Sequence, residues 1–293
     1  MPPSVVLWCP AYPMPPAKQE PALTAARAFV AAIGGELRVS KDFSAWLGEA
    51  AWAPPTQRQA SFRLALTDDL LLAGRGGYGC LDLLDVVAAH AGPLPGLIGY
   101  SDLTVLHAAW TVRGGPETLY GFMPGVPHGD RAVASAIAGW QGHGQGWDGG
   151  LLPEVRAVRQ GVAQGQLFAG CLRVLAGLVG TKWMPDLRGR VLAIEDIDER
   201  PYRIDRDLRQ LHLAGCLDGV VGLITNAFPA ALPPGYQGPS SSDIIGAWAE
   251  RLGIPALVGL PFGHHADPLT LPCGRSTSLS VGKTGWRLDI APR

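Results

Sequence analysis

The sequence has few charged residues and no excess of either sign. Its 293 residues include 24 Lys and Arg against 25 Asp and Glu, and charged residues are only 17% of the chain. A protein that binds nucleic acid needs surplus basic side chains to neutralise phosphates, so nucleic acid is not an expected partner. Apolar residues make up 47% of the chain, which excludes an intrinsically disordered protein, since disorder needs low hydrophobicity and high charge.

Long apolar runs and paired cysteines are also missing. The best candidate for a membrane span, residues 167–179, is interrupted by Arg173 and is shorter than the about 18 apolar residues required. The N-terminus has no basic start before its short apolar run, which does not fit a secretory signal. The five cysteines form no CxxC pair, which favours reduced thiols over disulfides or a zinc site. We therefore expect a cytoplasmic protein with no membrane partner.

Short apolar segments alternate with helical periodicity along the first part of the chain. Such alternation predicts βαβ units and a parallel sheet, in which functional groups gather beyond the carboxyl ends of the strands. The expected strands are residues 5–9, 36–39, 70–73 and 96–99, and the expected helices are 22–33, 81–90 and 102–112.

A second α/β unit follows a segment, 139–150, that is rich in Gly, Gln, His and Trp and has no periodicity. We predict an N-terminal domain over 1–135, a linker region over 136–165 and a C-terminal domain over 166–293. In the latter, strands are expected at 190–194, 220–225 and 256–260, helices at 204–214 and 240–252, and a hairpin over 279–290.

Ser101 lies between a short apolar strand and a helix, where a sharp turn can present its hydroxyl. The backbone N–H of Asp102 is then free to stabilise an oxyanion. The match to the G-x-S-x-G pattern is incomplete, because Leu103 occupies the second glycine position. A serine in this place is also an ordinary helix N-cap.

A glycine-rich turn over 74–79 follows another predicted strand, and it lacks both the P-loop ending and the G-x-G-x-x-G spacing. Its backbone can approach a ligand closely, to cradle a phosphate or supply an oxyanion N–H, or it is a plain tight turn.

Two further polar groups end predicted strands. Glu195 begins an acidic run, of a kind that often forms a solvated turn. His264 and His265 follow the strand end at Phe262; neighbouring histidines in a strand point to opposite sides, and two alone are a weak metal signal. With Ser101, they supply the residue types of a hydrolase in which histidine deprotonates serine and a carboxylate orients the histidine.

These segments together resemble the serine L,D-carboxypeptidases, a family that includes murein tetrapeptide carboxypeptidases and microcin-immunity peptidases. The resemblance rests on residues 74–79, 98–107, 180–181, 192–196, 201–206, 262–264 and 271–274, which follow one another in the family's order. It implies that Ser101 is the nucleophile, Glu195 the triad carboxylate and His264 the general base. The implied reaction is hydrolysis of an L–D amide, releasing terminal D-alanine from a murein tetrapeptide.

The resemblance also implies an oxyanion hole made by the backbone N–H groups of Asp102 and of Gly77 or Gly76. The implied fold is an N-terminal flavodoxin-like parallel-sheet domain with a smaller C-terminal α/β domain, usually as a homodimer, and neither metal nor organic cofactor is expected. A carboxypeptidase must bind a terminal carboxylate, for which a bidentate arginine is the natural partner. Arg75 is the candidate for this role; the alternative interpretation is that Arg75 is an ordinary surface residue without a role in binding.

The sequence departs from the family pattern in ways that concern the substrate. Residues 169–172 read Ala-Gly-Cys-Leu where Gly-Gly-Asn-Leu is usual, and Cys80-Leu81-Asp82 replaces Ser-x-Arg. One alternative is an amidase acting on a peptidyl-nucleotide or aminoacyl conjugate, which needs a stacking surface such as Trp183 or Trp147. A second alternative is a catalytically silent peptide-binding protein with the same fold.

Overall fold

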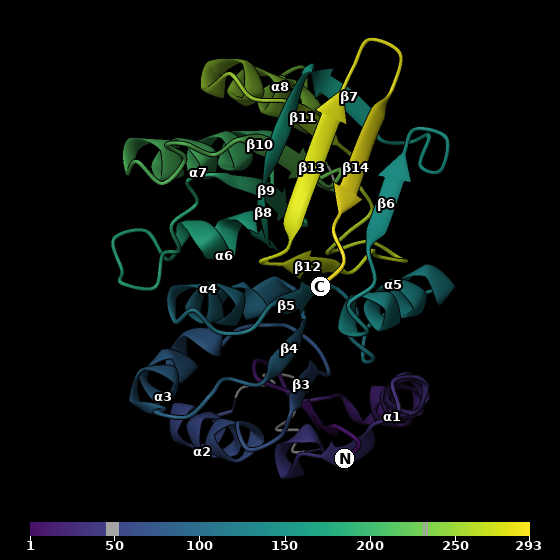
Figure 1. Cartoon of the computed structure of the whole chain (residues 1–293). Coiled ribbons are helices and arrows are strands. Elements are labelled where there is room, and N and C mark those ends of the chain that lie inside the picture. Colours follow the sequence, from purple (N-terminus) through teal and green to yellow (C-terminus); the bar gives the residue numbers. More distant parts are fainter. Residues whose placement is uncertain (45–52, 231, 233) are drawn as a thin grey trace.

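The computed structural model describes residues 1–44, 53–230, 232 and 234–293. These residues form two sheets, of six and eight strands, each flanked by helices. Figure 1 shows the N-terminal domain below the C-terminal domain. The predicted two-domain α/β class is confirmed.

Six short strands form the N-terminal sheet. They are β1 (Ser4–Trp8), β2 (Glu36–Val39), β3 (Leu70–Ala73), β4 (Gly96–Gly99), β5 (Thr118–Tyr120) and β12 (Leu271–Cys273). The order is β12-β5-β4-β3-β1-β2, in which β1 to β5 are parallel and β12 runs antiparallel beside β5. The order 2-1-3-4-5 is that of flavodoxin, so the flavodoxin-like prediction is confirmed.

Helices cover both faces of this sheet because its strands are apolar on both sides. One hydrophobic cluster joins one face to α2 (Pro55–Ala65), α3 (Leu84–Ala89) and α4 (Thr104–Val112). A second cluster joins the other face to α1 (Pro16–Ala32) and α5 (Asp130–Trp140). The short 3-10 helices are η1 (Lys41–Ser44), η2 (Cys80–Leu83) and η3 (Ser101–Leu103).

The helix expected over 22–33 begins earlier than predicted, at Pro16. Proline is well suited to the first helical position, because the N–H that it lacks would have no partner in the helix.

The C-terminal sheet is mixed. Its strands are β6 (Gln145–Asp148), β7 (Arg156–Arg159), β8 (Gly161–Cys171), β9 (Arg190–Glu195), β10 (Gly222–Thr225), β11 (Ala256–Val258), β13 (Ser276–Val281) and β14 (Trp286–Ile290). They lie in the order β6-β14-β13-β8-β9-β10-β11-β7, with β8 to β11 parallel. The helices are α6 (Leu172–Ala176), α7 (Pro201–Leu213) and α8 (Ser241–Leu252), the last begun by the predicted serine cap at Ser240. The terminal hairpin is confirmed by the β13–β14 pairing.

The region 136–165, predicted as a linker, carries strands. β6 pairs with β14 and β7 pairs with β11, at the two edges of the second sheet. Both are short edge strands whose residues are half-buried or exposed, so the apolar alternation that reveals a strand in a sequence is missing. The C-terminal sheet also has more strands than the N-terminal sheet, although the sequence predicts the smaller domain there.

The chain crosses between the domains near the site. β12 completes the N-terminal sheet, although it lies between β11 and β13 of the C-terminal sheet in the sequence. The buried Arg275 then pairs with Glu117 of the N-terminal domain, at 2.8 and 2.7 Å. The segment that leads to β12, which contains His264, is therefore tied to both domains.

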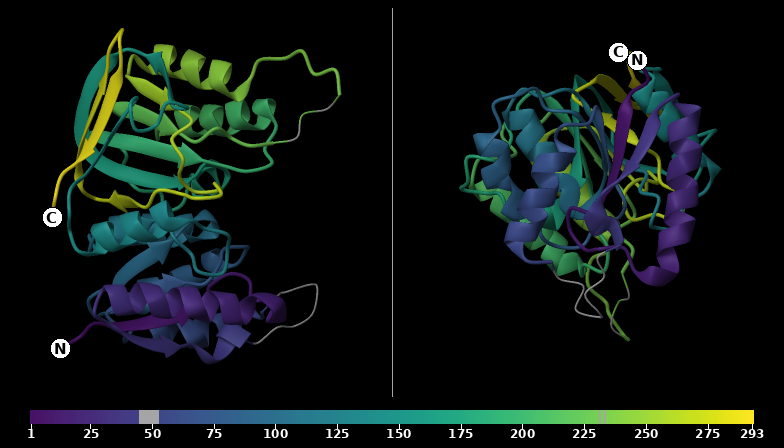
Figure 2. Two further views of the ribbon diagram at one scale, coloured as in Figure 1. Left: turned by 90° about the vertical axis from the view of Figure 1, so that its right-hand side faces the viewer. Right: turned by 90° about the horizontal axis from the view of Figure 1, so that it is seen from below.

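Figure 2 shows both ends of the chain on one side of the molecule. β1 begins on that side and the strands parallel to it run the same way, so their carboxyl ends lie on the opposite side. No helix in the described part of the chain is long and apolar enough to cross a membrane. All five cysteines are free thiols, four of them buried, as the sequence predicts.

Candidate active site

The turn after β4 holds Ser101 in a backbone conformation that side-chain-bearing residues rarely adopt. Its φ is 69°, and Gly99 two residues earlier has φ 153°. A left-handed conformation costs a residue other than glycine about 1–2 kcal/mol, so surrounding contacts must hold it in place. The sharp strand-to-helix turn predicted at Ser101 is present, although Leu103 replaces the second glycine.

A buried histidine fastens this turn to β5. His107 Nε2 lies 2.9 Å from the Gly99 carbonyl oxygen, and Nδ1 lies 2.7 Å from Thr118 Oγ1. Burial lowers the pKa of His107 to about 4, so the ring is neutral. Because a carbonyl only accepts hydrogen bonds, Nε2 carries the proton and Nδ1 accepts from the Thr118 hydroxyl.

The glycine turn after β3 packs directly on Ser101. A methyl group on Gly76 would lie 2.9 Å from Ser101 Cβ and 3.0 Å from Oγ, and one on Gly77 would overlap the Tyr12 ring at 2.5 Å. Gly77 also has φ 136°. Among the described residues, no backbone carbonyl accepts a hydrogen bond from the N–H of Gly76 or Gly77. Only glycine permits this approach to the serine.

Asp102 ties the two turns together. Its carboxylate Oδ2 accepts the backbone N–H of Cys80 at 2.8 Å, at the end of the glycine turn. Burial raises the pKa of the Asp102 carboxyl group above its ordinary value. The side chain therefore holds the two turns together, and the backbone N–H of Asp102 is the group that is left to stabilise an oxyanion.

Glu195 and His264 meet at the carboxyl end of β9. His264 Nδ1 is 2.8 Å from Glu195 Oε2, and the His264 backbone N–H donates to the same oxygen at 3.1 Å. Glu195 is fully buried, and a methyl group on Gly263 would lie only 2.3 Å from its Cδ. The neighbouring His265 instead accepts the Asp267 N–H through Nδ1, at 3.0 Å. Only one of the two histidines pairs with Glu195.

The surroundings of His264 favour its charged form. Burial works to lower the pKa of the imidazole, but the hydrogen bond and charge of Glu195, with the charges of Asp196 and Asp198, outweigh burial and raise the pKa above its ordinary value. The Tyr100 ring meets the imidazole edge-on, with centroids 5.1 Å apart. Since Glu195 engages Nδ1, Nε2 is the nitrogen that can exchange a proton with a ligand.

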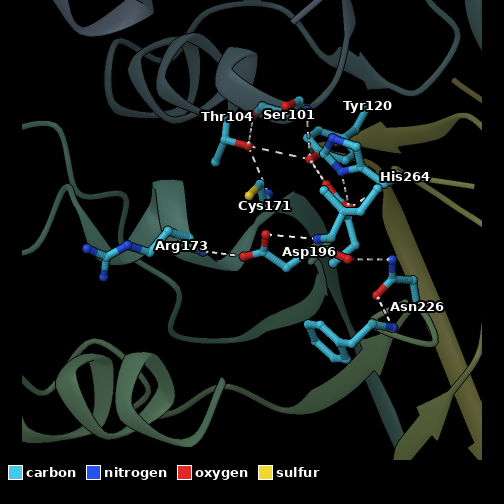
Figure 3. A network of polar contacts seen from close by, with 11 residues as sticks. Ser101, Thr104, Tyr120, Cys171, Arg173, Asp196, Asn226 and His264 are labelled. Carbon is cyan, nitrogen blue, oxygen red and sulfur yellow. Dashed lines mark hydrogen bonds and ion pairs between the residues drawn. The ribbon is translucent and has the colours of Figure 1, made fainter. Parts of the chain in front are cut away.

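Two buried hydroxyls connect Ser101 to the C-terminal domain, as Figure 3 shows. The Tyr120 hydroxyl lies 3.1 Å from the Ser101 nitrogen and 2.6 Å from Glu195 Oε1. Thr104 Oγ1 lies 2.7 Å from the Ser101 carbonyl oxygen and 2.8 Å from the Cys171 nitrogen. Sequence reasoning missed both hydroxyls as functional groups, because neither belongs to a recognisable catalytic pattern.

Asp196 organises the loop behind the site. Its carboxylate accepts the backbone N–H groups of Arg173 at 2.9 Å and Ile197 at 3.0 Å, and its carbonyl accepts Asn226 Nδ2 at 3.2 Å (Figure 3). Burial raises the pKa of Asp196 to about 6. The start of the acidic run is thus buried and hydrogen-bonded, in contrast to the solvated turn that such runs usually form.

Three other side chains proposed from the sequence form no hydrogen bond with Glu195 or His264 in the described part of the chain. The Arg75 guanidinium sits over the Tyr12 ring, 5.7 Å from its centroid. Trp183 is buried in the core, with 8% of its surface exposed. Trp147 is on β6, four strands away from β9, which is about 19 Å at the usual strand spacing. Within the described ranges, no cluster of three or more His, Cys, Asp or Glu residues could hold a metal ion.

A strained serine turn and a buried Glu–His pair, on a two-domain α/β fold, are features that serine hydrolases share. Residues 5–121 match the LD-carboxypeptidase N-terminal domain, and residues 164–279 match the LD-carboxypeptidase C-terminal domain. The chain belongs to the LD-carboxypeptidase family, which confirms the resemblance seen in the sequence.

Relatives and solved structures agree with this assignment. A putative carboxypeptidase of Streptomyces coelicolor is 34% identical over 253 residues, which cover 82% of this chain and 74% of the relative. The murein tetrapeptide carboxypeptidase of Pseudomonas aeruginosa is 29% identical over 224 residues, 72% of each chain. The crystal structure of muramoyltetrapeptide carboxypeptidase from Oxalobacter formigenes superposes with a TM-score of 0.80 at 26% identity, covering 98% of this chain and 99% of that one.

Proposed function

We propose that this chain is a serine L,D-carboxypeptidase that releases terminal D-alanine from a murein tetrapeptide. The observation that carries the proposal is the Glu195–His264 hydrogen bond of 2.8 Å, linked through the Tyr120 hydroxyl to the strained turn of Ser101. The substrate is inferred from the family and from the murein peptide carboxypeptidases among the relatives. Its bond joins an L-configured centre to D-alanine.

The proposed reaction proceeds through an acyl-enzyme. Ser101 Oγ attacks the amide carbonyl carbon while His264 Nε2 takes the hydroxyl proton, and Glu195 holds the resulting imidazolium. His264 then gives the proton to the amide nitrogen, the C–N bond breaks, and D-alanine leaves. Water attacks the ester with His264 again as base, which releases the shortened peptide and restores Ser101.

The charge that develops in both steps needs hydrogen-bond donors beside Ser101. The backbone N–H of Asp102 and that of Gly77 or Gly76 are the proposed oxyanion hole, since the glycine turn lies so near the serine that a methyl group on Gly76 would be 3.0 Å from Ser101 Oγ. Arg75 is the proposed partner of the substrate's terminal carboxylate, because it extends the same glycine turn. Arg75→Gln is then expected to raise KM more than it lowers kcat.

The proposal is tested with a panel of murein tetrapeptides carrying L-lysine or meso-diaminopimelate at the third position. Free D-alanine is measured for the wild type, for Ser101→Ala and for Ser280→Ala, a control on the exposed surface of β13. We expect release by the wild type and the control, and a loss of several orders of magnitude in Ser101→Ala. A wild type that leaves every tetrapeptide intact would refute the proposed substrate.

The two alternatives are separated by further measurements. A nucleotide conjugate needs an aromatic stacking face, and the burial of Trp183 and the distance of Trp147 from β9 give that reading no support. A silent binding protein would form no adduct with a fluorophosphonate, whereas an activated serine is labelled covalently. Labelling of the wild type at Ser101, absent in Ser101→Ala, is the result that the proposed mechanism requires.

A further inference from the structure

Both polar backbone groups of Ser101 are held by side-chain hydroxyls. Its N–H donates to the Tyr120 hydroxyl at 3.1 Å, and its carbonyl accepts from Thr104 Oγ1 at 2.7 Å. Tyr120 and Thr104 have no exposed surface, so water cannot replace either partner readily. These two contacts fix the peptide groups on both sides of a residue whose φ is 69°, which is how a strained conformation persists.

The direction of each hydrogen bond follows from its partners. Each hydroxyl has one proton, and carboxylate and carbonyl oxygens only accept. Tyr120 therefore donates to Glu195 Oε1, at 2.6 Å, and its oxygen accepts the Ser101 N–H. Thr104 donates to the Ser101 carbonyl, and its oxygen accepts the Cys171 N–H at 2.8 Å. Each hydroxyl thus connects Ser101 to one residue of the C-terminal domain.

The two attachment points are neighbours in the C-terminal sheet. Cys171 of β8 and Glu195 of β9 are paired in register at the carboxyl ends of their strands. A methyl group on Gly170 would lie 2.8 Å from Thr104 Cγ2, so β8 approaches α4 this closely because glycine precedes Cys171. The sequence therefore provides both the hydroxyls and the space that the contact needs.

We propose that Tyr120 and Thr104 are positioning residues that hold Ser101 in register with the Glu195–His264 pair across the domain boundary. The inference rests on the proposed catalytic roles of these three residues. Tyr120 has a second effect, because its proton disperses the charge of the carboxylate that holds His264. Thr104 has no contact with that carboxylate. Its Oγ1 lies 3.5 Å from the Tyr120 oxygen, but its single proton is given to the Ser101 carbonyl at 2.7 Å, so Thr104 acts chiefly on the position of Ser101.

Tyr120→Phe keeps the aromatic ring and removes both hydrogen bonds. We expect kcat to fall by about tenfold or more, because a hydrogen bond to a charged group and one to the serine turn are lost together. The charge of Glu195 is then less dispersed, so His264 holds its proton more tightly. The acidic limb of kcat/KM is expected to move to higher pH, by roughly half a unit.

Few groups other than Tyr120 could shift the acidic limb of kcat/KM by acting on His264. The charged groups that act on the imidazole are Glu195, Asp196 and Asp198, and the Tyr100 ring faces it edge-on. None of these side chains is altered in Tyr120→Phe. A shift of the acidic limb in this variant therefore reports the loss of the hydrogen bond from the Tyr120 hydroxyl to Glu195.

Thr104 allows a matched pair of variants. Thr104→Val removes the hydroxyl at nearly constant volume, and Thr104→Ser keeps it. We expect Thr104→Val to lower kcat by about tenfold while leaving the acidic limb unchanged, and Thr104→Ser to stay within about twofold of the wild type. Thr277→Val, which removes a buried hydroxyl that bonds to the Arg275 carbonyl, controls for loss of stability away from the site.

The experiment measures D-alanine release and fluorophosphonate labelling of Ser101 between pH 5 and 9 in these variants, with thermal unfolding alongside. The proposal is supported by three results together. Tyr120→Phe and Thr104→Val release D-alanine more slowly than the wild type, Thr104→Ser keeps a rate near that of the wild type, and only Tyr120→Phe shifts the acidic limb. Wild-type rates in Tyr120→Phe and Thr104→Val, or a slowed Tyr120→Phe with an unmoved limb, would overturn it. A wild type that is labelled but releases no D-alanine refutes the proposed substrate alone, since the labelling rates still test the positioning roles.

Discussion

Gly263→Ala places a methyl group where the carboxyl group of Glu195 already lies. The new Cβ would be 2.3 Å from Glu195 Cδ, about 1 Å inside an ordinary carbon–carbon contact. Glu195 is fully buried and hydrogen-bonded to both Tyr120 and His264, so its carboxylate cannot move away without disturbing these bonds. Either the carboxylate or the loop that carries His264 must move by a comparable amount.

The two costs of this substitution can be separated. Gly263 has φ 65°, so alanine adds about 1–2 kcal/mol of backbone strain, which acts on stability. A misplacement of about 1 Å in catalytic groups can lower the rate by about a hundredfold. We therefore expect kcat/KM for D-alanine release to fall by about two orders of magnitude, with a smaller effect on folding.

Gly253→Ala is the matched control. Gly253 has φ 72° at the end of α8, and a methyl group there has no atom within 4 Å. It introduces the same strain without the collision. The thermal unfolding temperature should therefore fall in both variants, further in Gly263→Ala because of the overpacking, while only Gly263→Ala loses activity. A folded Gly263→Ala with kcat/KM within twofold of the wild type would show that the Glu195–His264 geometry does not govern the rate.

Three further predictions concern protonation and domain contacts. His264 must be neutral to act as a base, and its pKa is raised above the ordinary histidine value. We therefore expect kcat/KM to rise with pH, with a midpoint above that of an ordinary histidine, and Glu195→Gln to move the midpoint down. An unmoved midpoint in Glu195→Gln contradicts the assignment. Asp267 accepts the N–H groups of residues 129 and 132 at the start of α5, at 3.0 and 2.8 Å. Asp267→Ala should therefore cost about 1 kcal/mol in urea unfolding, with Asp267→Asn largely retaining stability. Arg275→Ala leaves Glu117 with Arg293 as a partner but removes the donor to the carbonyls of Gly139 and His143. It should therefore destabilise the protein by roughly 2 kcal/mol; a change below 0.5 kcal/mol, on the order of a surface substitution, would contradict that role.

Much of the N-terminal sheet can be predicted from the sequence because its strands are buried on both faces. The apolar runs at 70–73 and 96–99 coincide with β3 and β4, since each is bounded by turn-forming residues. β6 and β7 could not be found in this way, because edge strands that are half exposed show no apolar alternation. The return of β12 to the N-terminal sheet depends on long-range pairing with β5, which local periodicity cannot reveal.

The sequence likewise points to some residues of the candidate site and not to others. Ser101, Glu195 and His264 each follow a strand, and the rule that sites gather at carboxyl ends draws attention to them. The short contact between Gly263 and Glu195, and the hydroxyls of Tyr120 and Thr104, are properties of packing between segments that lie far apart in the sequence. Those contacts decide the geometry on which the proposed chemistry depends.

Release of D-alanine from a murein tetrapeptide tests the central claim most directly. Purified wild type and Ser101→Ala are incubated with tetrapeptides that end in D-alanine and, as a stereochemical control, in L-alanine. We predict release of D-alanine by the wild type only, with no cleavage of the L-terminated peptide. Equal release by Ser101→Ala, or no release by the wild type, would contradict the claim that this serine hydrolyses an L–D amide bond.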